Sequence, residues 1–227
     1  MTGKTHMLDK FEQIYRDLVN GLQPSLNIEE ILNLILENSH SFTPSWHALG
    51  FIHCQLYKND NGTLRLHIWP KNYRHKYEQK EKIHDHIFSL NSYVVCGEIK
   101  NLYYELVPHT SLNCVDKLQL YKVEYKENCS ILAPTGKFFL PILSESNFIK
   151  SKEIYKIDRK VFHESNVDHS QLVCTLVSTY DFVKDDPHML GVLTLEDQIV
   201  REKVKFPINE WKEIIQEVIN ELNLAHT

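Results

Sequence analysis

The stretch Lys82–Asn101, KIHDHIFSLNSYVVCGEIKN, decides how the rest of the chain is interpreted. It begins with the triplet His84-Asp85-His86 and continues into residues that favour a β-strand. Side chains at alternate positions of a strand point to the same face. If the triplet is extended, His84 and His86 present two imidazoles side by side, and Asp85 points the other way. Such a pair suits a borderline divalent metal ion such as Fe(II), Mn(II), Ni(II) or Zn(II).

The same pair of histidines has a simpler interpretation. The chain contains 13 histidines, so two of them can stand two positions apart by chance. Two surface histidines on a solvated loop would produce the same pattern. The residues around the pair must therefore decide between a metal site and a loop.

The surroundings of the pair resemble the first motif of the cupin superfamily. That motif runs Gly, five residues, His-x-His, three or four residues, Glu, six residues and Gly. His84 and His86 match its histidines, and Gly97 matches the closing glycine if Leu90 takes the glutamate position. Glu78 replaces the opening glycine. Loss of the glutamate is typical of cupins with three histidine ligands, among them the thiol dioxygenases similar to cysteine dioxygenase.

In such cupins a histidine on a later strand completes the site. The resemblance covers Leu64–Leu195 and implies that this ligand is His163, in the segment KVFHESNVDHS. The lead-in YKIDRKVF resembles the second cupin motif, although Lys160 and Asp158 stand where glycine and proline are expected. His169 is the alternative. Three imidazoles without a carboxylate would leave up to three open positions on the metal, Fe(II) first, for substrate and O2.

Length and composition are those of an ordinary soluble domain. The chain has 227 residues, of which 42% are hydrophobic and 24% charged, and its formal net charge is −5. Without a basic block, it is not expected to bind nucleic acid or an anionic membrane. Five cysteines without a CxxC pair argue against a disulfide framework and fit a cytoplasmic protein. No apolar run is long enough for a membrane span.

The spacing of apolar residues predicts helices at both ends of the chain and strands between them. Phe11–Leu22 and Ile28–Ser39 keep a helical period, as does the closing segment that begins at Pro207. Between Trp46 and Leu195, short strand patterns alternate with turns. We therefore expect a mainly β fold, an antiparallel double-stranded β-helix of the cupin or jelly-roll type, with two N-terminal helices and one C-terminal helix.

The expected organisation has three parts. Residues 1–45 form an N-terminal helical extension, residues 46–200 the cupin barrel, and residues 201–227 a C-terminal helix packed on the barrel. The N-terminal helices either cover their own sheet or form a homodimer contact. The stretch Val107–Ile149 is longer than the usual spacer between cupin motifs, and an insertion at the barrel mouth would account for it.

A second group of candidate site residues lies on the expected strand Leu64–Trp69, whose side chains alternate between two faces. Arg65, His67 and Trp69 share one face, and Arg74 follows in the next loop. If this face lines the barrel mouth, an arginine can hold the carboxylate of a substrate through two parallel hydrogen bonds. The alternatives are a solvated edge strand and an internal ion pair with a nearby acid.

Tyrosines are the remaining candidates for chemistry. Tyr93, Tyr103, Tyr104 and Tyr180 could each place a phenol near the metal, and we take Tyr104 and Tyr180 as the catalytic candidates. Thiol dioxygenases that carry a Cys–Tyr crosslink have the cysteine five residues after the second histidine, a position that Asn91 occupies here. The resemblance therefore does not extend to the crosslink, which weakens the case for a cysteine-type substrate.

These features lead to three hypotheses of function. The first is a non-haem Fe(II) cupin oxygenase, a dioxygenase that binds iron through His84, His86 and His163 and acts with O2 on a small polar, carboxylate-bearing substrate. The second is a metal-dependent isomerase or lyase, in which the metal acts only as a Lewis acid. The third is a small-molecule-binding cupin without turnover. Mn, Ni or Zn could replace iron in each of them.

Overall fold

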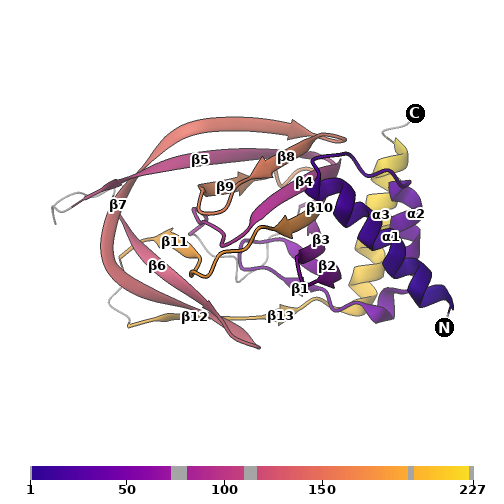
Figure 1. Ribbon diagram of the computed structural model, residues 1–227, viewed down its shortest axis with the longest axis horizontal. Coiled ribbons are helices and arrows are strands. Elements are labelled where there is room, and N and C mark those ends of the chain that lie inside the picture. Colours follow the sequence, from indigo (N-terminus) through magenta and orange to yellow (C-terminus); the bar gives the residue numbers. More distant parts are fainter. Residues whose placement is uncertain (1, 73–80, 110–116, 194–196, 225–227) are drawn as a thin grey trace.

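The structure is a computed structural model of the chain, and it describes residues 2–72, 81–109, 117–193 and 197–224. Within these residues the helices gather at one end of the molecule and the strands fill the rest (Figure 1). The helices are α1 (Thr2–Val19), α2 (Ile28–Glu37), α3 (Ile208–Leu224) and the short 3-10 helix η1 (Ser39–Ser41). The strands are β1 (Ser45–Trp46), β2 (Ile52–Asn59), β3 (Gly62–Trp69), β4 (Ser89–Cys96), β5 (Glu98–Pro108), β6 (Leu118–Tyr125), β7 (Cys129–Lys150), β8 (Ile154–Ile157), β9 (Phe162–Asn166), β10 (Val173–Tyr180), β11 (His188–Gly191), β12 (Ile199–Glu202) and β13 (Val204–Lys205).

The strands form two antiparallel sheets. Sheet A has the order β13-β1-β2-β3-β10-β4-β8, and sheet B has the order β11-β6-β7-β5-β9, with β12 paired to β7. Two helices precede the sheets in the chain and one follows them. The predicted architecture is therefore confirmed as mainly β with two antiparallel sheets, two N-terminal α-helices and one C-terminal α-helix.

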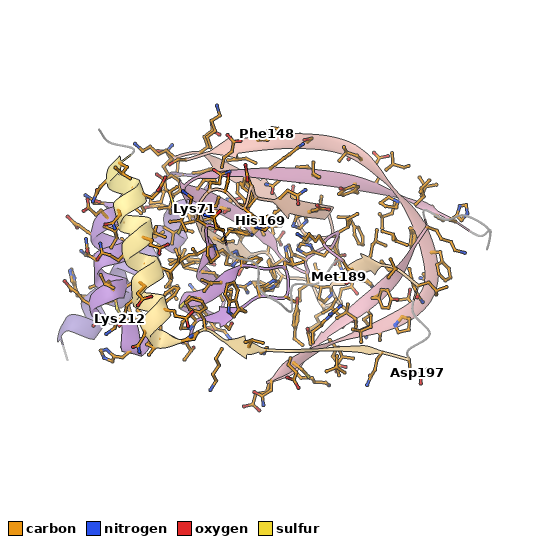
Figure 2. The ribbon with its side chains drawn as sticks, turned by 180° about the vertical axis from the view of Figure 1, so that it is seen from behind. Lys71, Phe148, His169, Met189, Asp197 and Lys212 are labelled. Atoms are coloured by element: carbon orange, nitrogen blue, oxygen red, sulfur yellow. The ribbon has the colours of Figure 1, made fainter. Side chains whose placement is uncertain are left out.

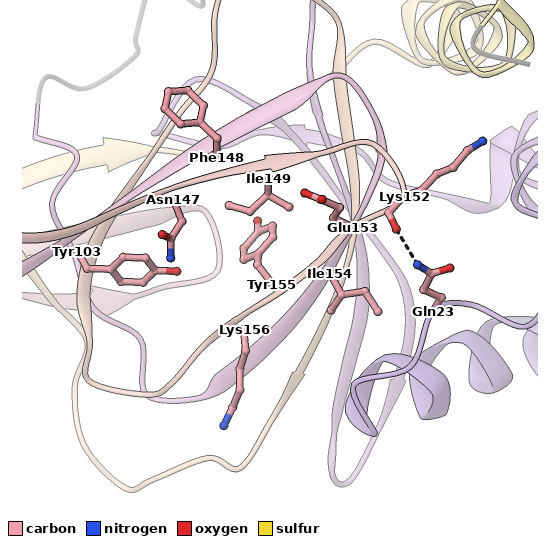
Figure 3. Close-up of a pocket in the computed structure, with 10 residues that line it drawn as sticks. All are labelled: Gln23, Tyr103, Asn147, Phe148, Ile149, Lys152, Glu153, Ile154, Tyr155 and Lys156. Atoms are coloured by element: carbon pink, nitrogen blue, oxygen red, sulfur yellow. Dashed lines mark hydrogen bonds between the residues drawn. The ribbon is translucent and has the colours of Figure 1, made fainter.

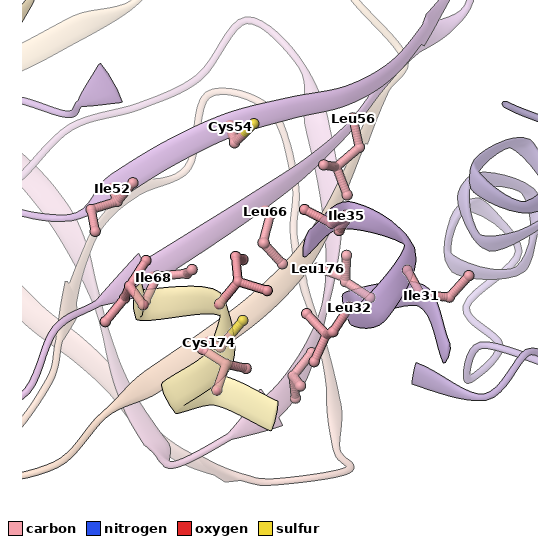
Figure 4. Packing of buried hydrophobic residues seen from close by; sticks show 14 of the residues in the cluster. Ile31, Leu32, Ile35, Ile52, Cys54, Leu56, Leu66, Ile68, Cys174 and Leu176 are labelled. Carbon is pink, nitrogen blue, oxygen red and sulfur yellow. The ribbon is translucent and has the colours of Figure 1, made fainter. Parts of the chain in front are cut away.

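The helices cover one face of sheet A (Figure 4). Leu64, Leu66 and Ile68 of β3 are fully buried there, because alternate side chains of a strand point to one face. From α3, Trp211 and Ile215 pack into the same cluster and are 0% exposed. Each large apolar side chain buried in this way contributes about 1.5–3 kcal/mol. The main hydrophobic core thus lies between the helices and sheet A, outside the space between the two sheets.

The ends of the helices follow local rules. Asn27 caps α2 by accepting a hydrogen bond from the backbone N–H of Glu29 at 2.9 Å. α1 begins at Thr2, earlier than the predicted start at Phe11, and ends before Gly21, whose φ of 71° takes the chain out of the helix.

The long stretch Val107–Ile149 is occupied largely by β6 and β7. β7 is a single strand of 22 residues that pairs with β5, β6 and β12 along its length. In Figure 1 it arcs around the end of the molecule opposite to the helices. Within sheet B, β7 therefore connects β5 on one side to β6, and through β6 to β11, on the other.

Two isolated bridges close sheet B into a ring. His84 pairs with His163 of β9 on one side and with Met189 of β11 on the other. The backbone groups of His84 and His163 exchange two hydrogen bonds, at 3.0 and 2.9 Å. The short segment around His84 thus joins the two edges of sheet B, and its side chains alternate between the face that looks toward sheet A and the opposite face.

Among the described residues, no helix is long and apolar enough to span a membrane.

Candidate metal centre

The structure brings His84, His86 and His163 together. Each can offer one nitrogen such that all three nitrogens lie within 4.8 Å of one another. The ring centroids are 4.7 Å apart for His84 and His86, 4.4 Å for His84 and His163, and 5.0 Å for His86 and His163. The two-residue spacing of the first pair and the bridge between His84 and His163 place the three imidazoles on one face.

Hydrogen bonds to the backbone orient two of these rings. The Nδ1–H of His84 donates to the carbonyl oxygen of Lys82 at 2.7 Å, and the Nδ1–H of His163 donates to that of Val161 at 3.0 Å. Each bond fixes the tautomer in which Nδ1 carries the proton and Nε2 keeps its lone pair. The two imidazoles are thus prepared to offer Nε2 to a metal ion.

Burial keeps the three imidazoles uncharged. It lowers the pKa of His163 to about 3, with a further decrease from His84. Burial likewise lowers the pKa of His84, and it lowers that of His86 well below the usual value, with contributions from the neighbouring imidazoles and Arg65. Metal ions bind the neutral form of histidine, so no proton must leave before a metal enters. The nitrogen-only ligand set, its tautomers and its neutrality all fit a borderline divalent ion such as Fe(II).

Arg65 lies on the same side of sheet A as this centre. Its Nε–H donates to Oγ1 of Thr63 at 2.8 Å, and its guanidinium lies 5.1 Å from the ring centroid of Phe88. Phe88 in turn stacks on His86, with ring centroids 4.7 Å apart and ring planes 13° apart. Burial lowers the pKa of Arg65. In the described part of the chain no carboxylate forms an ion pair with it, so neither Glu98 nor Glu105 neutralises this guanidinium.

Three further histidines lie beside Arg65 and the triad. His53 and His67 are direct partners on β2 and β3, with ring centroids 5.4 Å apart, and His47 lies 6.5 Å from His53. Burial lowers the pKa of His53 to about 4, and the pKa values of His47 and His67 well below the usual value. Nε2 of His67 is buried and has no hydrogen-bond partner within the described residues. Sequence reasoning missed His47 and His53, although the pairing of β2 with β3 would have placed His53 opposite His67.

Trp69 belongs to an apolar cluster between the two sheets. It is 8% exposed and packs against Phe51, with ring centroids 4.8 Å apart. Phe51 also packs on His67 at 4.6 Å and on His47 at 4.3 Å. The predicted substrate residues Arg65, His67 and Trp69 therefore face one interior, in which Trp69 forms part of the apolar wall.

The two tyrosines predicted to be catalytic lie elsewhere. The hydroxyl of Tyr180 donates to Oδ1 of Asn91 at 3.1 Å, and Nδ2 of Asn91 donates to the carbonyl of Leu18 in α1 at 2.6 Å. Tyr180 therefore belongs to the helix-covered side of sheet A. Tyr104 lines a cavity of about 730 Å³ with Asp85, on the face of sheet B that points away from the three imidazoles.

Tyr103, unlike Tyr104, shares a face of sheet B with His163, and it also borders the cavity of about 730 Å³. It is the register partner of His163, and directly opposite side chains share one face of a sheet. Burial raises its pKa, with a further increase from Glu145. Tyr155 lies beside it across the interior, and burial raises its pKa to about 12. Both tyrosines line a cavity of about 600 Å³ at the edge of the two sheets (Figure 3).

The remaining predicted residues are Arg74 and His169. Arg74 lies outside the described residues. His169 lies in the turn after β9, where its carbonyl accepts a hydrogen bond from the backbone N–H of Asn72 at 2.7 Å (Figure 2). Met189, also labelled in Figure 2, is the second bridge partner of His84. Of the two alternatives for the third ligand, the structure thus groups His163 with the pair.

Comparisons with known proteins give only distant likenesses. No family model matches the chain, and no curated protein matches its sequence. FeII HppE is 10% identical, and the likeness covers 79% of this chain and 98% of that one with a TM-score of 0.34. Hydroxypropylphosphonic acid epoxidase from S. wedmorenis is 12% identical, over 79% and 97%, with the same TM-score of 0.34. A likeness at this level is too distant to support an inference about chemistry.

Proposed function

We propose that this protein is a non-haem Fe(II) oxygenase of the cupin type that acts with O2 on a small polar substrate carrying a carboxylate. The observation that carries this proposal is the group formed by His84, His86 and His163, three neutral imidazoles within 4.8 Å of one another. A bound Fe(II) would supply the one-electron chemistry that reactions of O2 require. A site of nitrogen ligands alone is also suited to Mn, Ni or Zn.

Arg65 is the proposed anchor of the substrate carboxylate. Its Nε is held by Thr63, which fixes the plane of the guanidinium, and no described acid occupies its two terminal nitrogens. A half-buried guanidinium without an anionic partner is costly, and a carboxylate ligand would remove that cost through two parallel hydrogen bonds. Phe88 contacts both the guanidinium of Arg65 and the ring of His86. A carboxylate held by Arg65 would therefore lie beside the proposed metal centre.

The walls of the interior would exclude bulk water from the bound substrate. Phe51 and Trp69 close the interior on the side of β3, and the histidines packed against them are uncharged. A dry site strengthens the contact between a carboxylate and Arg65, and it protects reactive species from hydrolysis. Tyr103, on the same face as His163, is the phenol best placed to exchange a proton with a substrate held there.

The test begins with the protein reconstituted anaerobically with Fe(II). A thermal-shift screen of amino acids and keto acids identifies carboxylates that stabilise the iron-loaded protein, and each of these is then assayed for O2 consumption. The proposal predicts Fe(II)-dependent O2 uptake with at least one stabilising carboxylate. Turnover of a carboxylate without O2 uptake would favour the isomerase or lyase, and stabilisation without any turnover would favour a binding protein.

A further inference from the structure

The extended segment that carries His84 and His86 also carries a buried carboxylate on its other side. Asp85 is 2% exposed and points away from the imidazoles, as the alternation of a strand requires. Its Oδ1 accepts a hydrogen bond from the backbone N–H of His188 at 2.6 Å. Its Oδ2 lies 3.6 Å from Nζ of Lys160 and 3.5 Å from Nδ1 of His188. A buried carboxylate is stable only when such partners surround it.

Lys160 connects this carboxylate to the segment of the third imidazole. It lies three positions before His163, and its backbone N–H donates to the carbonyl oxygen of His86 at 2.8 Å. Its ammonium group contacts Oδ2 of Asp185 at 2.8 Å and the carbonyl oxygen of Asp186 at 2.7 Å. Lys160 therefore touches both segments that supply the imidazoles, and also the loop that precedes β11.

The backbone of Lys160 adopts a conformation that its side chain does not favour. Its φ is 63°, in the left-handed region where residues other than glycine are strained. Glycine is the residue that this backbone alone would favour. The lysine side chain is thus present in spite of its conformational cost, and its ammonium group lies among Asp85, Asp185 and the carbonyl oxygen of Asp186.

We propose that Lys160 and Asp85 form a clamp, a pair of positioning residues that sets the placement of His84 and His86 relative to His163. The ammonium of Lys160 and the carboxylate of Asp85 lie on the side of the His84–His86 segment opposite to the imidazoles, and both residues border the cavity of about 730 Å³. The clamp acts through the backbone: it fixes the segment of the histidine pair against β9 and β11 and thereby sets the positions of the imidazoles. This inference rests on the metal centre proposed above.

The test uses Co(II) alone as the probe, titrated anaerobically into the full chain and followed by its visible absorption. Lys160→Met removes the charge and keeps the backbone strain, Lys160→Gly removes the charge and relieves the strain, and Asp85→Asn keeps an acceptor for His188 without the charge. Lys156→Met is the matched control, because Lys156 forms an exposed ion pair with Asp158 in the same part of the chain. The stability of each metal-free variant is measured in parallel by urea unfolding.

The clamp predicts that Lys160→Met, Lys160→Gly and Asp85→Asn each weaken Co(II) binding by about tenfold or more, the usual effect of removing a group that orients metal ligands. It also predicts that the Co(II) spectra of these three variants at saturation differ from the wild-type spectrum. Lys160→Arg, which keeps the charge, should retain most of the wild-type affinity for Co(II). Lys156→Met should bind Co(II) like the wild type. A change in the saturated spectrum reports ligand geometry, which a loss of overall stability alone would not alter.

Two results would overturn the clamp. One is wild-type affinity and an unchanged spectrum in Lys160→Gly and Asp85→Asn. The other is weaker binding that only follows the loss of stability of the metal-free protein, with a wild-type spectrum at saturation. If Lys160→Met does not fold, Lys160→Gly removes the same charge without the backbone strain and makes the comparison in its place. Failure of the wild-type protein itself to bind Co(II) would instead contradict the metal centre.

Discussion

The two faces of sheet A have opposite chemical characters. Along β3, Leu64, Leu66 and Ile68 point to the helices, while Arg65 and His67 point to the space between the sheets. The helix side is filled mainly by almost fully buried apolar side chains, with Asn91 and, within the described residues, the unpartnered Nε1 of Trp211 as buried polar groups among them. The inner side buries charge and imidazole, and it leaves Nε2 of His67 and Oγ1 of Thr175 without hydrogen-bond partners in the described residues.

This difference separates stability from function within one sheet. Each buried polar atom without a partner costs about 1–3 kcal/mol, so the inner face lowers the free energy of unfolding. The apolar core on the helix side offsets that cost. Buried polar groups without partners lower the free energy of unfolding, and they become favourable once a ligand forms hydrogen bonds with them. We therefore place the metal and the substrate on the inner face.

The largest effect is expected on the helix side. Ile215→Asp places an unpaired charge where the side chain is 0% exposed, and it should lower the free energy of unfolding by about 3–5 kcal/mol. Gln216→Asp is the matched control, because Gln216 is the next residue of the same helix and is exposed. Urea unfolding measures both variants. An effect of Ile215→Asp below about 0.5 kcal/mol would show that this face of α3 is not core.

A smaller effect is expected for substrate binding on the inner face. Arg65→Lys keeps the charge but cannot form two parallel hydrogen bonds with a carboxylate, so the affinity for stabilising carboxylates should fall by about 1.5–3 kcal/mol. Thermal shifts with metal present give this comparison for wild type and variant. Equal stabilisation of both proteins by every carboxylate would show that Arg65 is not the anchor.

The pH dependence of stability should also distinguish the two faces. Burial holds the pKa of His53 at about 4 in the folded chain, so below about pH 6.5 the unfolded state binds a proton that the folded state does not. Stability should therefore fall with decreasing pH from about 6.5 down to about 4, by up to about 1.4 kcal/mol per pH unit for this group. His53→Gln should reduce that slope in urea unfolding, and His40→Gln, at an exposed position, should leave it unchanged.

The smallest effect is a gain in stability on the inner face. His67→Phe replaces a ring with an unsatisfied buried nitrogen by a ring of similar shape, packed against Phe51 and Trp69. It should raise the free energy of unfolding by about 1 kcal/mol. Replacement of Leu66 by histidine, the opposite exchange on the helix side of the same strand, should be destabilising. If His67→Phe instead lowered the free energy of unfolding, the buried nitrogen of His67 would not be destabilising.

The sequence predicted much of this fold because its alternation is clear. The pattern of Leu64–Trp69 predicted one strand with two faces, and the apolar stripe containing Trp211 and Ile215 predicted the closing helix. The spacing of His84 and His86 predicted a shared face, and the cupin resemblance indicated His163; the structure groups all three. These inferences need only local periodicity or a motif.

The choice of tyrosine could not be made in the same way. Tyr103 and Tyr104 are neighbours, and which of them faces the interior depends on the register of β5 with β9, which pairs Tyr103 with His163. A register shift between these two tyrosines in the pairing of β5 with β7 obscures the face further. Likewise, His53 joins the inner cluster only through its pairing with β3. Register between strands is set by long-range packing, which a local pattern does not contain.

The central claim is that His84, His86 and His163 hold a metal ion, and metal analysis tests it most directly. The protein is purified without a histidine tag, loaded anaerobically with Fe(II), freed of excess metal and assayed for bound iron. We expect stoichiometric iron in the wild type and in His53→Ala, and none in His84→Ala or His86→Ala, because two remaining imidazoles do not hold the ion. Full iron occupancy in the variant that lacks both His84 and His86 would place the site elsewhere and contradict this account.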